Sequence, residues 1–404
     1  MSLLVFALVL QAQTFEQRGF VEFRGLGFPQ TTINDSGHVV GESLLRYESS
    51  WRPKPWLKLQ SGFDARFDTH RQFDRERRLD FEDRRTPRPA LSLRRLSLQA
   101  HKGRWTAEVG RQFIRWGKAD LLTPTDRFAP KDFLNVAYSD FLAVPATRVT
   151  YEKGSNTVDV VMQVRFVPSR GPLLNQRWVT LPSELDGIAV RDRGAQYPGG
   201  VQTGLRWNHV GRGYEYSLMI YEGRNHLPLF NGNLERVSPL TIGVERYFPH
   251  LRQYGGDVVV PLRWFTVKSE AAYYQSKTRD MDEFVLYVIQ LERIVGEWTF
   301  VGGYAGEAVT QTTGNRLLFA PDRGLAKAFL GRAAYTIDSR RSVAFDIAAR
   351  QNGKGLLARA EYSQTFGQQW RATAQLSLIR GDKNDFLGQY RRNSSAALIV
   401  RYSF

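Results

Sequence analysis

The chain closes on Asn393-Ser-Ser-Ala-Ala-Leu-Ile-Val-Arg-Tyr-Ser-Phe404. Counting back by twos from Phe404 gives Tyr402, Val400, Leu398 and Ala396. Because successive side chains of a strand point to opposite faces, these five residues share one face, and that face ends in two aromatic rings. The stretch therefore predicts an amphipathic β-strand that runs to the last residue.

This strand resembles the closing strand of Gram-negative outer-membrane β-barrels. In that family the terminal aromatic strand is also what the barrel-assembly machinery reads, so the resemblance implies an assembly signal at Tyr402 and Phe404. The closing strand of a soluble β-sandwich has the same local pattern. The rest of the chain has to decide between the two.

The composition permits a membrane barrel. The 404 residues are 24% charged, their mean hydropathy is −0.39, and no run approaches the 18 or more apolar residues of a transmembrane helix. A transmembrane barrel alternates lipid-facing and lumen-facing residues, so its hydropathy averages out. Thirty-five Gly, 13% aromatic residues and no Cys favour β structure and exclude disulfides and thiolate metal sites.

The N-terminus predicts a short secretory signal peptide over residues 1–13. Leu3 to Leu10 form an apolar run that is too short to span a bilayer, and small and polar residues follow near Ala12. No Lys or Arg precedes the run, which departs from the usual signal pattern, and a buried first strand is the alternative. Residues 14–404 are then expected to form one outer-membrane β-barrel.

Alternating segments recur through the whole chain. Trp370, Ala372, Ala374, Leu376 and Leu378 share one parity, opposite polar residues of the other parity. One segment changes phase, which predicts a β-bulge near Arg94 and Arg95. We expect about eighteen strands, with sixteen as the alternative. They lie near 20–28, 41–51, 56–68, 90–100, 104–115, 146–153, 157–167, 200–208, 213–221, 250–260, 263–275, 284–292, 297–305, 328–337, 342–350, 355–365, 370–379 and 393–404.

The connections between these segments alternate in length. If Phe404 lies in the periplasm, the short turns fall on that side and the long connections mostly fall on the other, as in bacterial outer-membrane barrels. Trp56, Trp105 and Trp370 open strands just after short turns, where an interfacial aromatic girdle belongs. A β-propeller would show a repeat of about forty residues, and the chain has none. The fold class is therefore all-β: a single transmembrane antiparallel up-and-down barrel with short periplasmic turns and long extracellular loops.

Arginine dominates the charge. The formal net charge is +16, and 45 of the 56 basic residues are Arg. Guanidinium groups bind carboxylate and phosphate in planar, bidentate contacts. One interpretation is a wall of cross-strand ion pairs that stiffens the barrel, and the other is a water-filled pore that favours anions. The cations expected to line the lumen are Arg66, Arg148, Arg165, Arg206, Lys268, Arg332, Arg350, Arg359 and Arg371, together with Lys58 and Arg401.

Two long loops stand out. Residues 71–88 hold seven Arg among five acidic residues, which indicates either a solvated loop or a binding site for lipopolysaccharide phosphates.

The segment Gly110-Arg-Gln-Phe-Ile-Arg-Trp-Gly117 leads into a second loop that is rich in Pro and Asp. The strand that begins Gly110-Arg-Gln and the Pro- and Asp-rich loop that follows it together resemble those of alginate-export and substrate-selective porins. The resemblance implies that the loop folds into the lumen as a constriction, although a plain extracellular loop is the alternative. Its candidate lining residues are Arg115, Lys118, Asp120, Asp126, Arg127, Lys131 and Asp132.

Catalytic, metal and cofactor motifs are missing from the sequence. The six His show no metal spacing, and there is no Gly-x-Ser-x-Gly, phosphate-binding Gly loop or His-Glu-x-x-His. Basicity alone would allow nucleic-acid binding, but here the positive charge is scattered and interleaved with acid. We therefore expect no catalytic residue, no metal, no cofactor and no nucleic-acid partner.

The function expected from sequence is a channel for small polar solutes, with a preference for anions, in the outer membrane of a Gram-negative bacterium. Its expected partners are membrane lipid and lipopolysaccharide, the barrel-assembly machinery and the solute. The alternatives are a barrel enzyme of the protease or lipase type, and a structural or adhesion barrel plugged by its own loops.

Overall fold

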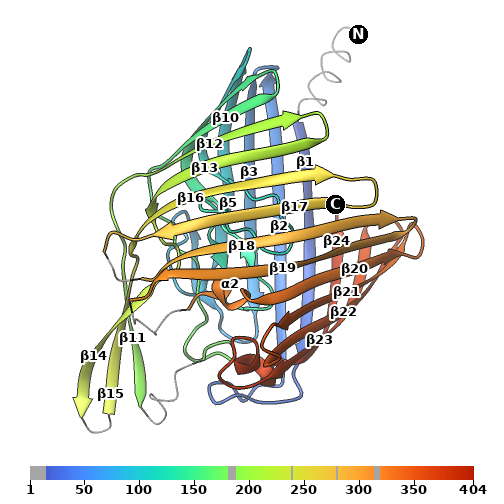
Figure 1. The fold of residues 1–404 in the computed structure, drawn as a ribbon. Coiled ribbons are helices and arrows are strands. Elements are labelled where there is room, and N and C mark those ends of the chain that lie inside the picture. Colours follow the sequence, from blue (N-terminus) through green and yellow to red (C-terminus); the bar gives the residue numbers. More distant parts are fainter. Residues whose placement is uncertain (1–14, 181–187, 238–239, 279–280, 314–318) are drawn as a thin grey trace, which may run out of the picture.

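A computed structural model describes residues 15–404 except 181–187, 238–239, 279–280 and 314–318, and shows a closed β-barrel (Figure 1). In that part of the chain eighteen strands pair antiparallel around the barrel, from β1 to β24 and back to β1. They are β1 (Phe15–Gly27), β2 (Val39–Lys54), β3 (Leu57–Asp68), β5 (Arg88–Lys102), β6 (Trp105–Gln112), β9 (Val144–Lys153), β10 (Asn156–Gln163), β12 (Gln202–Gly211), β13 (Tyr214–Arg224), β16 (His250–Pro261), β17 (Thr266–Gln275), β18 (Glu283–Val295), β19 (Trp298–Gln311), β20 (Ala328–Thr336), β21 (Arg341–Arg350), β22 (Gly355–Phe366), β23 (Trp370–Gly381) and β24 (Ser395–Ser403).

The remaining elements belong to the connections. β4 (Phe73–Asp80) pairs parallel with the start of β5, and β7 (Lys131–Asp132) pairs with β8 (Asp140–Phe141). β11 (Ala189–Gln196), β15 (Leu240–Tyr247) and β14 (Leu229–Val237) form a three-stranded sheet that extends beyond one end of the barrel (Figure 1). The described residues also include two short helices, α2 (Pro321–Gly324) and η2 (Gly388–Asn393).

The terminal strand closes the barrel. β24 pairs with β1 from Phe20↔Ser403 to Gly27↔Ala396, and the backbones of Gly19 and Phe404 exchange two hydrogen bonds of 2.9 Å. A Cβ on Gly19 would lie 2.7 Å from the Phe404 ring, so glycine makes room for the terminal aromatic side chain. The closing strand inferred from sequence is thus one half of the barrel seam.

Alternation along each strand separates an apolar exterior from a polar interior. In β23, Leu376 is 64% exposed on the outer surface, whereas Gln375 and Ser377 on either side are buried inside. Large apolar side chains are exposed on other strands as well, as with Leu218, Phe329 and Leu398. A closed barrel with this exterior satisfies its backbone internally and presents the surface that lipid requires.

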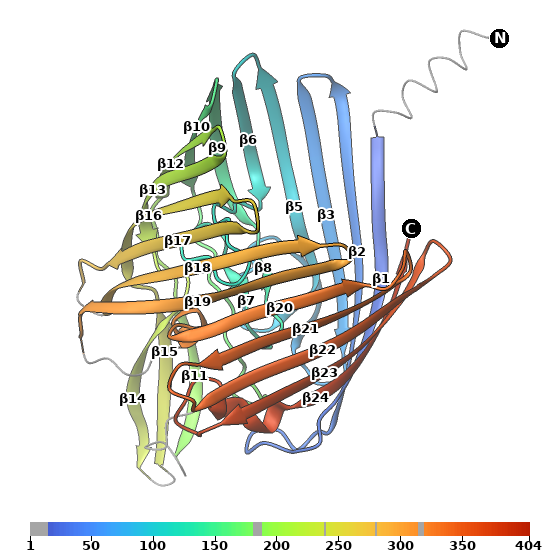
Figure 2. The same cartoon turned by 45° about the vertical axis from the view of Figure 1, so that its right-hand side comes forward.

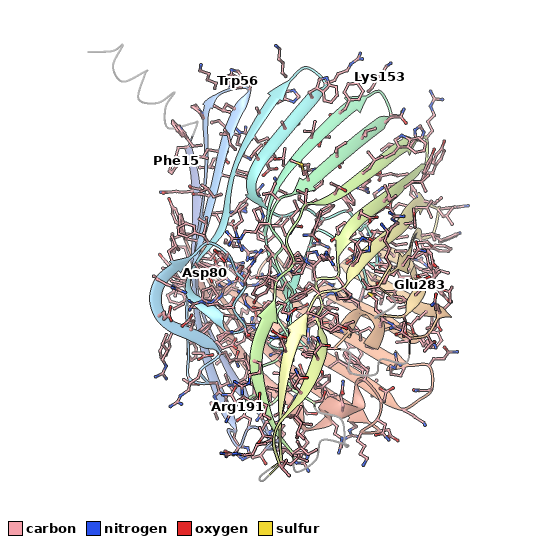
Figure 3. The ribbon with its side chains drawn as sticks, turned by 90° about the vertical axis from the view of Figure 1, so that its left-hand side faces the viewer. Phe15, Trp56, Asp80, Lys153, Arg191 and Glu283 are labelled. Carbon is pink, nitrogen blue, oxygen red and sulfur yellow. The ribbon has the colours of Figure 1, made fainter. Side chains whose placement is uncertain are left out.

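The two ends of the barrel differ in their connections. Short turns lie at one end, where Trp56 and Lys153 are labelled in Figure 3, and the longer loops lie at the opposite end with Arg191. Aromatic pairs gather at the short-turn end, including Trp105–Tyr151 at 4.6 Å and Trp370–Tyr402 at 4.9 Å between ring centroids. This is the interfacial placement that amphipathic rings prefer.

The strand pattern predicted from sequence is confirmed. Eighteen barrel strands are present in the described residues, and each overlaps one predicted range. The predicted bulge is also present: Gly62 faces Arg95 and Phe63 faces Leu93, which leaves Arg94 unpaired in the ladder. Boundaries shift by a few residues, so that β6 ends at Gln112 instead of 115 and β19 extends to Gln311.

The signal peptide predicted over residues 1–13 lies outside the described residues. No helix in the described part of the chain is long and apolar enough to cross a membrane.

Candidate functional site

The loop between β6 and β9, residues 113–143, runs through the interior of the barrel, where β7 and β8 are labelled in Figure 2. Gly110 has φ +123°, and a Cβ there would collide with the carbonyl oxygen of Leu96. Only glycine adopts this backbone conformation without strain. The glycine lies two residues before the end of β6, where the chain leaves the barrel wall.

A buried carboxylate holds the near half of this loop against the opposite wall. Glu270, on the inner face of β17, accepts hydrogen bonds from the N–H groups of Lys118 (3.1 Å), Ala119 (3.2 Å) and Thr125 (2.7 Å). The Thr125 hydroxyl donates to the same carboxylate at 2.6 Å. Four hydrogen bonds from the loop converge on this one side chain, so Glu270 is the main polar anchor of the loop.

The neighbouring strand β18 and a second residue of β17 add further anchors. Gln290 of β18 accepts from the N–H groups of Asp120 (2.9 Å) and Leu121 (3.2 Å). Lys268 Nζ lies 2.7 Å from the Asp120 carboxylate. Burial alone would raise the pKa of Asp120, but its hydrogen bonds to Lys268 and Gln290 hold that pKa below the ordinary value. The carboxylate therefore stays ionised and keeps its partners.

An apolar cluster fills the space beside these anchors. Trp116 and Phe128 from the loop meet edge to face at 5.2 Å, and Phe128 meets Tyr221 of β13 at 5.1 Å. Buried side chains of β16–β20, such as Leu251 and Leu286, belong to the same cluster. Trp116 and Phe128 are 2% and 1% exposed within it. The loop and its apolar contacts thus occupy the side of the lumen that β9–β20 enclose.

A substitution at Gly204 of β12 tests this packing. A Cβ at Gly204 would lie 2.6 Å from Phe128 and 2.7 Å from Trp116. We expect Gly204→Val to destabilise the folded barrel by about 1–3 kcal/mol through overpacking, measured as a lower unfolding temperature by heat-modifiable gel mobility. Gly302→Val is the matched control, because a Cβ on Gly302 would meet no atom within 4 Å. Equal stability of the two variants would contradict the packing described.

The other side of the interior holds a polar cavity of about 480 Å³. The second half of the loop, including Tyr138 and Asp140, forms one wall, and β1–β5, β22 and β24 form the other. Six carboxylates line it: Glu22, Glu42, Asp64, Asp83, Asp132 and Asp140. Nine arginines line it: Arg24, Arg46, Arg66, Arg88, Arg94, Arg111, Arg170, Arg359 and Arg401. The lining is therefore cationic, with three more arginines than carboxylates.

Aromatic rings hold several of these guanidinium groups in place. The Cζ atoms of Arg359 and Arg24 lie 4.5 and 5.3 Å from the centroid of Tyr138. Arg401 lies 4.2 Å from the ring of Phe20. Such cation–π contacts stabilise a guanidinium without neutralising it. These contacts hold the three guanidinium groups against the loop and the β1 wall.

The cavity is lined by fewer carboxylates than arginines, so several arginines share one carboxylate. Asp64 receives Arg46 at 2.8 Å and Arg66 at 2.5 Å, while Asp140 receives Arg94 at 3.2 Å and Arg46 at 3.3 Å. Burial alone would raise the pKa of Asp140, but the guanidinium groups of Arg94 and Arg46 hold it below its ordinary value. These arginines therefore share two ionised carboxylates.

Arg359 differs from its neighbours because no carboxylate in the described residues pairs with it. Its side chain donates to the carbonyl oxygen of Ala137 at 2.6 Å and stacks on Tyr138. The Tyr138 hydroxyl in turn donates to Gln375 of β23 at 2.5 Å. Arg359 thus contributes an unneutralised charge to the cavity and ties the loop to the β22–β23 wall.

A second network borders the cavity near β5. Arg111 donates to Asp83 at 2.6 Å, Asp83 also binds Arg170, and Arg170 reaches Asp132 at 3.2 Å. Arg88 binds the same Asp132 at 2.8 Å. Sequence reasoning missed Arg111, Arg170 and Asp83. The available signal was that Arg111 interrupts the apolar parity of its strand directly after a glycine.

Of the predicted lumen cations, Arg66, Arg359 and Arg401 border the cavity. Most of the others face carboxylates elsewhere in the barrel. Arg165 lies beyond the end of β10 and pairs with Glu82, and Arg371 donates to Ser363 at 3.0 Å. The remaining pairs are Arg148–Asp159, Arg206–Asp257, Lys268–Glu292, Arg332–Asp346 and Arg350–Asp385.

The predicted loop residues lie in three settings. Asp132 borders the cavity, and Arg115 stacks on Phe141 at 4.2 Å. Three others support the loop: Lys118 lies 2.8 Å from Glu215 and 2.9 Å from Asp257, Asp120 binds Lys268, and Asp126 accepts from the Trp116 and Gly117 N–H groups. Arg127 lies over Tyr274, and Lys131 pairs with Asp322 at 3.3 Å. Among the described residues, no group of three His, Asp or Glu side chains is placed to hold a metal ion.

Comparisons with known proteins support the fold. No protein-family model and no curated protein matches the sequence. Among solved structures, a BenF-like porin from Pseudomonas fluorescens Pf-5 is similar, with 9% identity, a TM-score of 0.56 and coverage of 97% of each chain. OccAB4 of Acinetobacter baumannii is similar with 10% identity, a TM-score of 0.53 and coverage of 96% of this chain and 98% of that one. At this identity the similarity establishes a porin-like barrel fold.

Proposed function

We propose that this porin-like barrel is an outer-membrane channel that conducts small polar solutes and favours anions. The observation that carries the proposal is the excess of arginines over carboxylates around the interior cavity. Loop 113–143 and its buried apolar cluster fill part of the opposite side of the lumen, so the cavity offers the open polar path. A solute that crosses the barrel would therefore pass the arginines.

Electrostatics supports anion preference. Unit charges about 6 Å apart interact by roughly 0.7 kcal/mol even in bulk water, and by more where protein restricts the solvent. An excess of fixed positive charge attracts anions and repels cations of the same size. The aromatic contacts and the shared carboxylates hold the guanidinium groups near the cavity surface, so little reorganisation is needed when an anion enters.

Location and assembly form part of the same proposal. The apolar exterior, the aromatic girdle and the division into short turns and long loops fit the outer membrane of a Gram-negative bacterium. Tyr402 and Phe404 lie at the outer surface of the closing strand, with Phe404 52% exposed. This exposure suits recognition by a barrel-assembly machinery before the seam with β1 forms.

A second candidate is a barrel plugged by its own loops, and the contacts of one residue, Arg177, favour it. Arg177, in the long loop 164–201, is 3% exposed and lies 3.6 Å over the ring of Phe28. It also binds Asp35 at 3.2 Å, while the backbone carbonyl of Arg177 accepts from Asn393 at 3.0 Å. Three extracellular loops are thus tied together, which would suit a closed mouth. No feature of the described residues favours an enzyme.

Planar-bilayer recording of the full chain distinguishes these candidates. In a KCl gradient we expect a stable conductance whose reversal potential shows preference for chloride. The preference should be largest near 0.01 M salt, where the Debye length is about 30 Å, and should fall toward 1 M, where it is about 3 Å. Preference for potassium would refute the anion proposal, and a folded but non-conducting barrel would favour the plugged form.

A further inference from the structure

A cluster of cations lies at the long-loop end of β22–β24. Its members, here called the β22–β24 rim, are Lys354, Arg380, Lys383, Arg391 and Arg392, and all five are exposed. Leu356 pairs with Arg380 in the β22–β23 ladder, and the N–H of Asp382 donates to the carbonyl oxygen of Lys354 at 2.8 Å. Arg391 and Arg392 belong to η2, the short red helical turn at the long-loop end of these strands in Figure 2.

The rim cations are not neutralised by the protein. Among the described residues none of the five forms an ion pair, and the Arg391 side chain reaches only the carbonyl oxygen of Gly388, at 3.3 Å. Two carboxylates lie nearby. Asp385 is buried and pairs with Arg350 at 3.1 Å. Asp382 is exposed and accepts a hydrogen bond from the Asn384 N–H, so of these two carboxylates only Asp382 offsets the charge of the rim.

The loop that is richest in arginine, residues 71–88, differs from the rim because some of its cations pair with carboxylates. Within residues 71–88, Arg85 binds both Asp74 and Glu76, and Arg78 binds Glu76 at 2.9 Å. Arg88 points inward to Asp132. Three of the seven arginines of this loop are therefore neutralised by carboxylates, so the loop offers fewer free cations to an anion than its composition indicates.

The rim adjoins the apolar outer surface. Arg380 continues the outward parity of Leu376 and Leu378, whose exposed fractions are 64% and 39%. On the next strand Leu398 is 56% exposed on the same surface. Cations directly beyond an apolar band, at the long-loop end, lie at the height of the outer-leaflet headgroups in a bilayer.

We propose that the β22–β24 rim binds the phosphate groups of a phosphorylated glycolipid of the outer leaflet, of the lipid A type. This inference rests on the proposed outer-membrane location. Arginine fits phosphate oxygens in bidentate contacts, and lysine adds point charge. The apolar band below the rim would contact the acyl chains of the same lipid, so one lipid satisfies both parts of the surface.

The test measures binding of bisphosphorylated lipid A to the purified full chain in non-ionic detergent, by native mass spectrometry. The rim variant carries Lys354→Gln, Arg380→Gln, Lys383→Gln, Arg391→Gln and Arg392→Gln. The control removes the same charge from cations of other long loops that are paired with carboxylates, by Arg78→Gln, Arg85→Gln, Arg165→Gln, Arg191→Gln and Arg193→Gln. Heat-modifiable mobility confirms that each variant is folded.

We expect the rim variant to bind lipid A about tenfold or more weakly, because each basic residue near an anionic lipid surface contributes measurably, and the control to bind as the parent does. Dephosphorylated lipid A should bind the parent as weakly as lipid A binds the rim variant. Binding should survive EDTA, because the side chains contact phosphate directly. Equal binding by parent and rim variant, or release by EDTA, would overturn the proposal. Neither result depends on conductance, so failure of the channel proposal is separately visible.

Discussion

Removing Arg24, Arg94 and Arg359 together by substitution with Gln is expected to abolish the anion preference of the channel. The three substitutions eliminate the whole excess of arginines over carboxylates around the cavity. At separations of about 6 Å each charge contributes roughly 0.7 kcal/mol in water, so the chloride-to-potassium permeability ratio should fall by about tenfold or more. The measurement is the reversal potential in a KCl gradient at low salt.

These three arginines were chosen so that no cavity carboxylate loses its last partner. Glu22 keeps Arg401 at 2.9 Å, and Asp64 and Asp140 both keep Arg46. The barrel should therefore fold normally, because truncation leaves no buried charge unpaired.

A matched control removes Arg104, Arg212 and Arg263, which are exposed in or beside short turns far from the cavity. Its reversal potential should remain close to that of the parent. If the cavity variant keeps the parent's selectivity, or if the control loses it to the same extent, ions do not pass the cavity arginines.

Replacing Glu270 by Ala is expected to release loop 113–143 and to raise the single-channel conductance. The carboxylate is 2% exposed and accepts four hydrogen bonds from the loop. Its removal leaves buried N–H groups without an acceptor, at about 1–3 kcal/mol each. The summed cost of these unpaired N–H groups exceeds the stabilisation that the remaining anchors of the loop provide. The loop should therefore move within the lumen while the barrel stays folded.

The expected readouts are a larger and noisier conductance, and trypsin cleavage at Lys118 or Arg127, which are protected in the parent. Glu292→Ala is the control, because Glu292 pairs with Lys268 on the adjacent strand and has no contact with the loop among the described residues. Unchanged conductance together with unchanged protease resistance would show that the apolar contacts of Trp116 and Phe128 hold the loop without Glu270.

The strands were predictable because their signal is local. Alternation at a period of two decides which residues face outward, and it needs only the neighbouring residues. Gln375 and Ser377 are buried beside the exposed Leu376, as their parity predicts. The bulge at Arg94 was equally visible, because a change of parity within one strand has few other physical causes.

The candidate site was predictable only in part. Arg66 and Arg359 were expected in the lumen, and they border the cavity. Arg206 and Arg332 were expected there by the same parity rule, yet each pairs with a carboxylate on another strand of the wall, Asp257 of β16 and Asp346 of β21. Parity determines on which side of the wall a side chain lies, but it does not determine the side chain's partner. Partner choice depends on which loops enter the barrel.

The sequence by itself determined a membrane-type barrel of about eighteen strands, closed by the terminal strand, with short turns at one end and long loops mostly at the other. Only the tertiary structure decided where the lumen is open, because Glu270 and the N–H groups it binds are about 150 residues apart in the chain. The same holds for Arg170 beside Asp83, and for the exposed rim at β22–β24, where the cations have no carboxylate to bind. Strand alternation is a property of consecutive residues, whereas charge pairing and cavity shape arise from contacts that exist only after the barrel has closed.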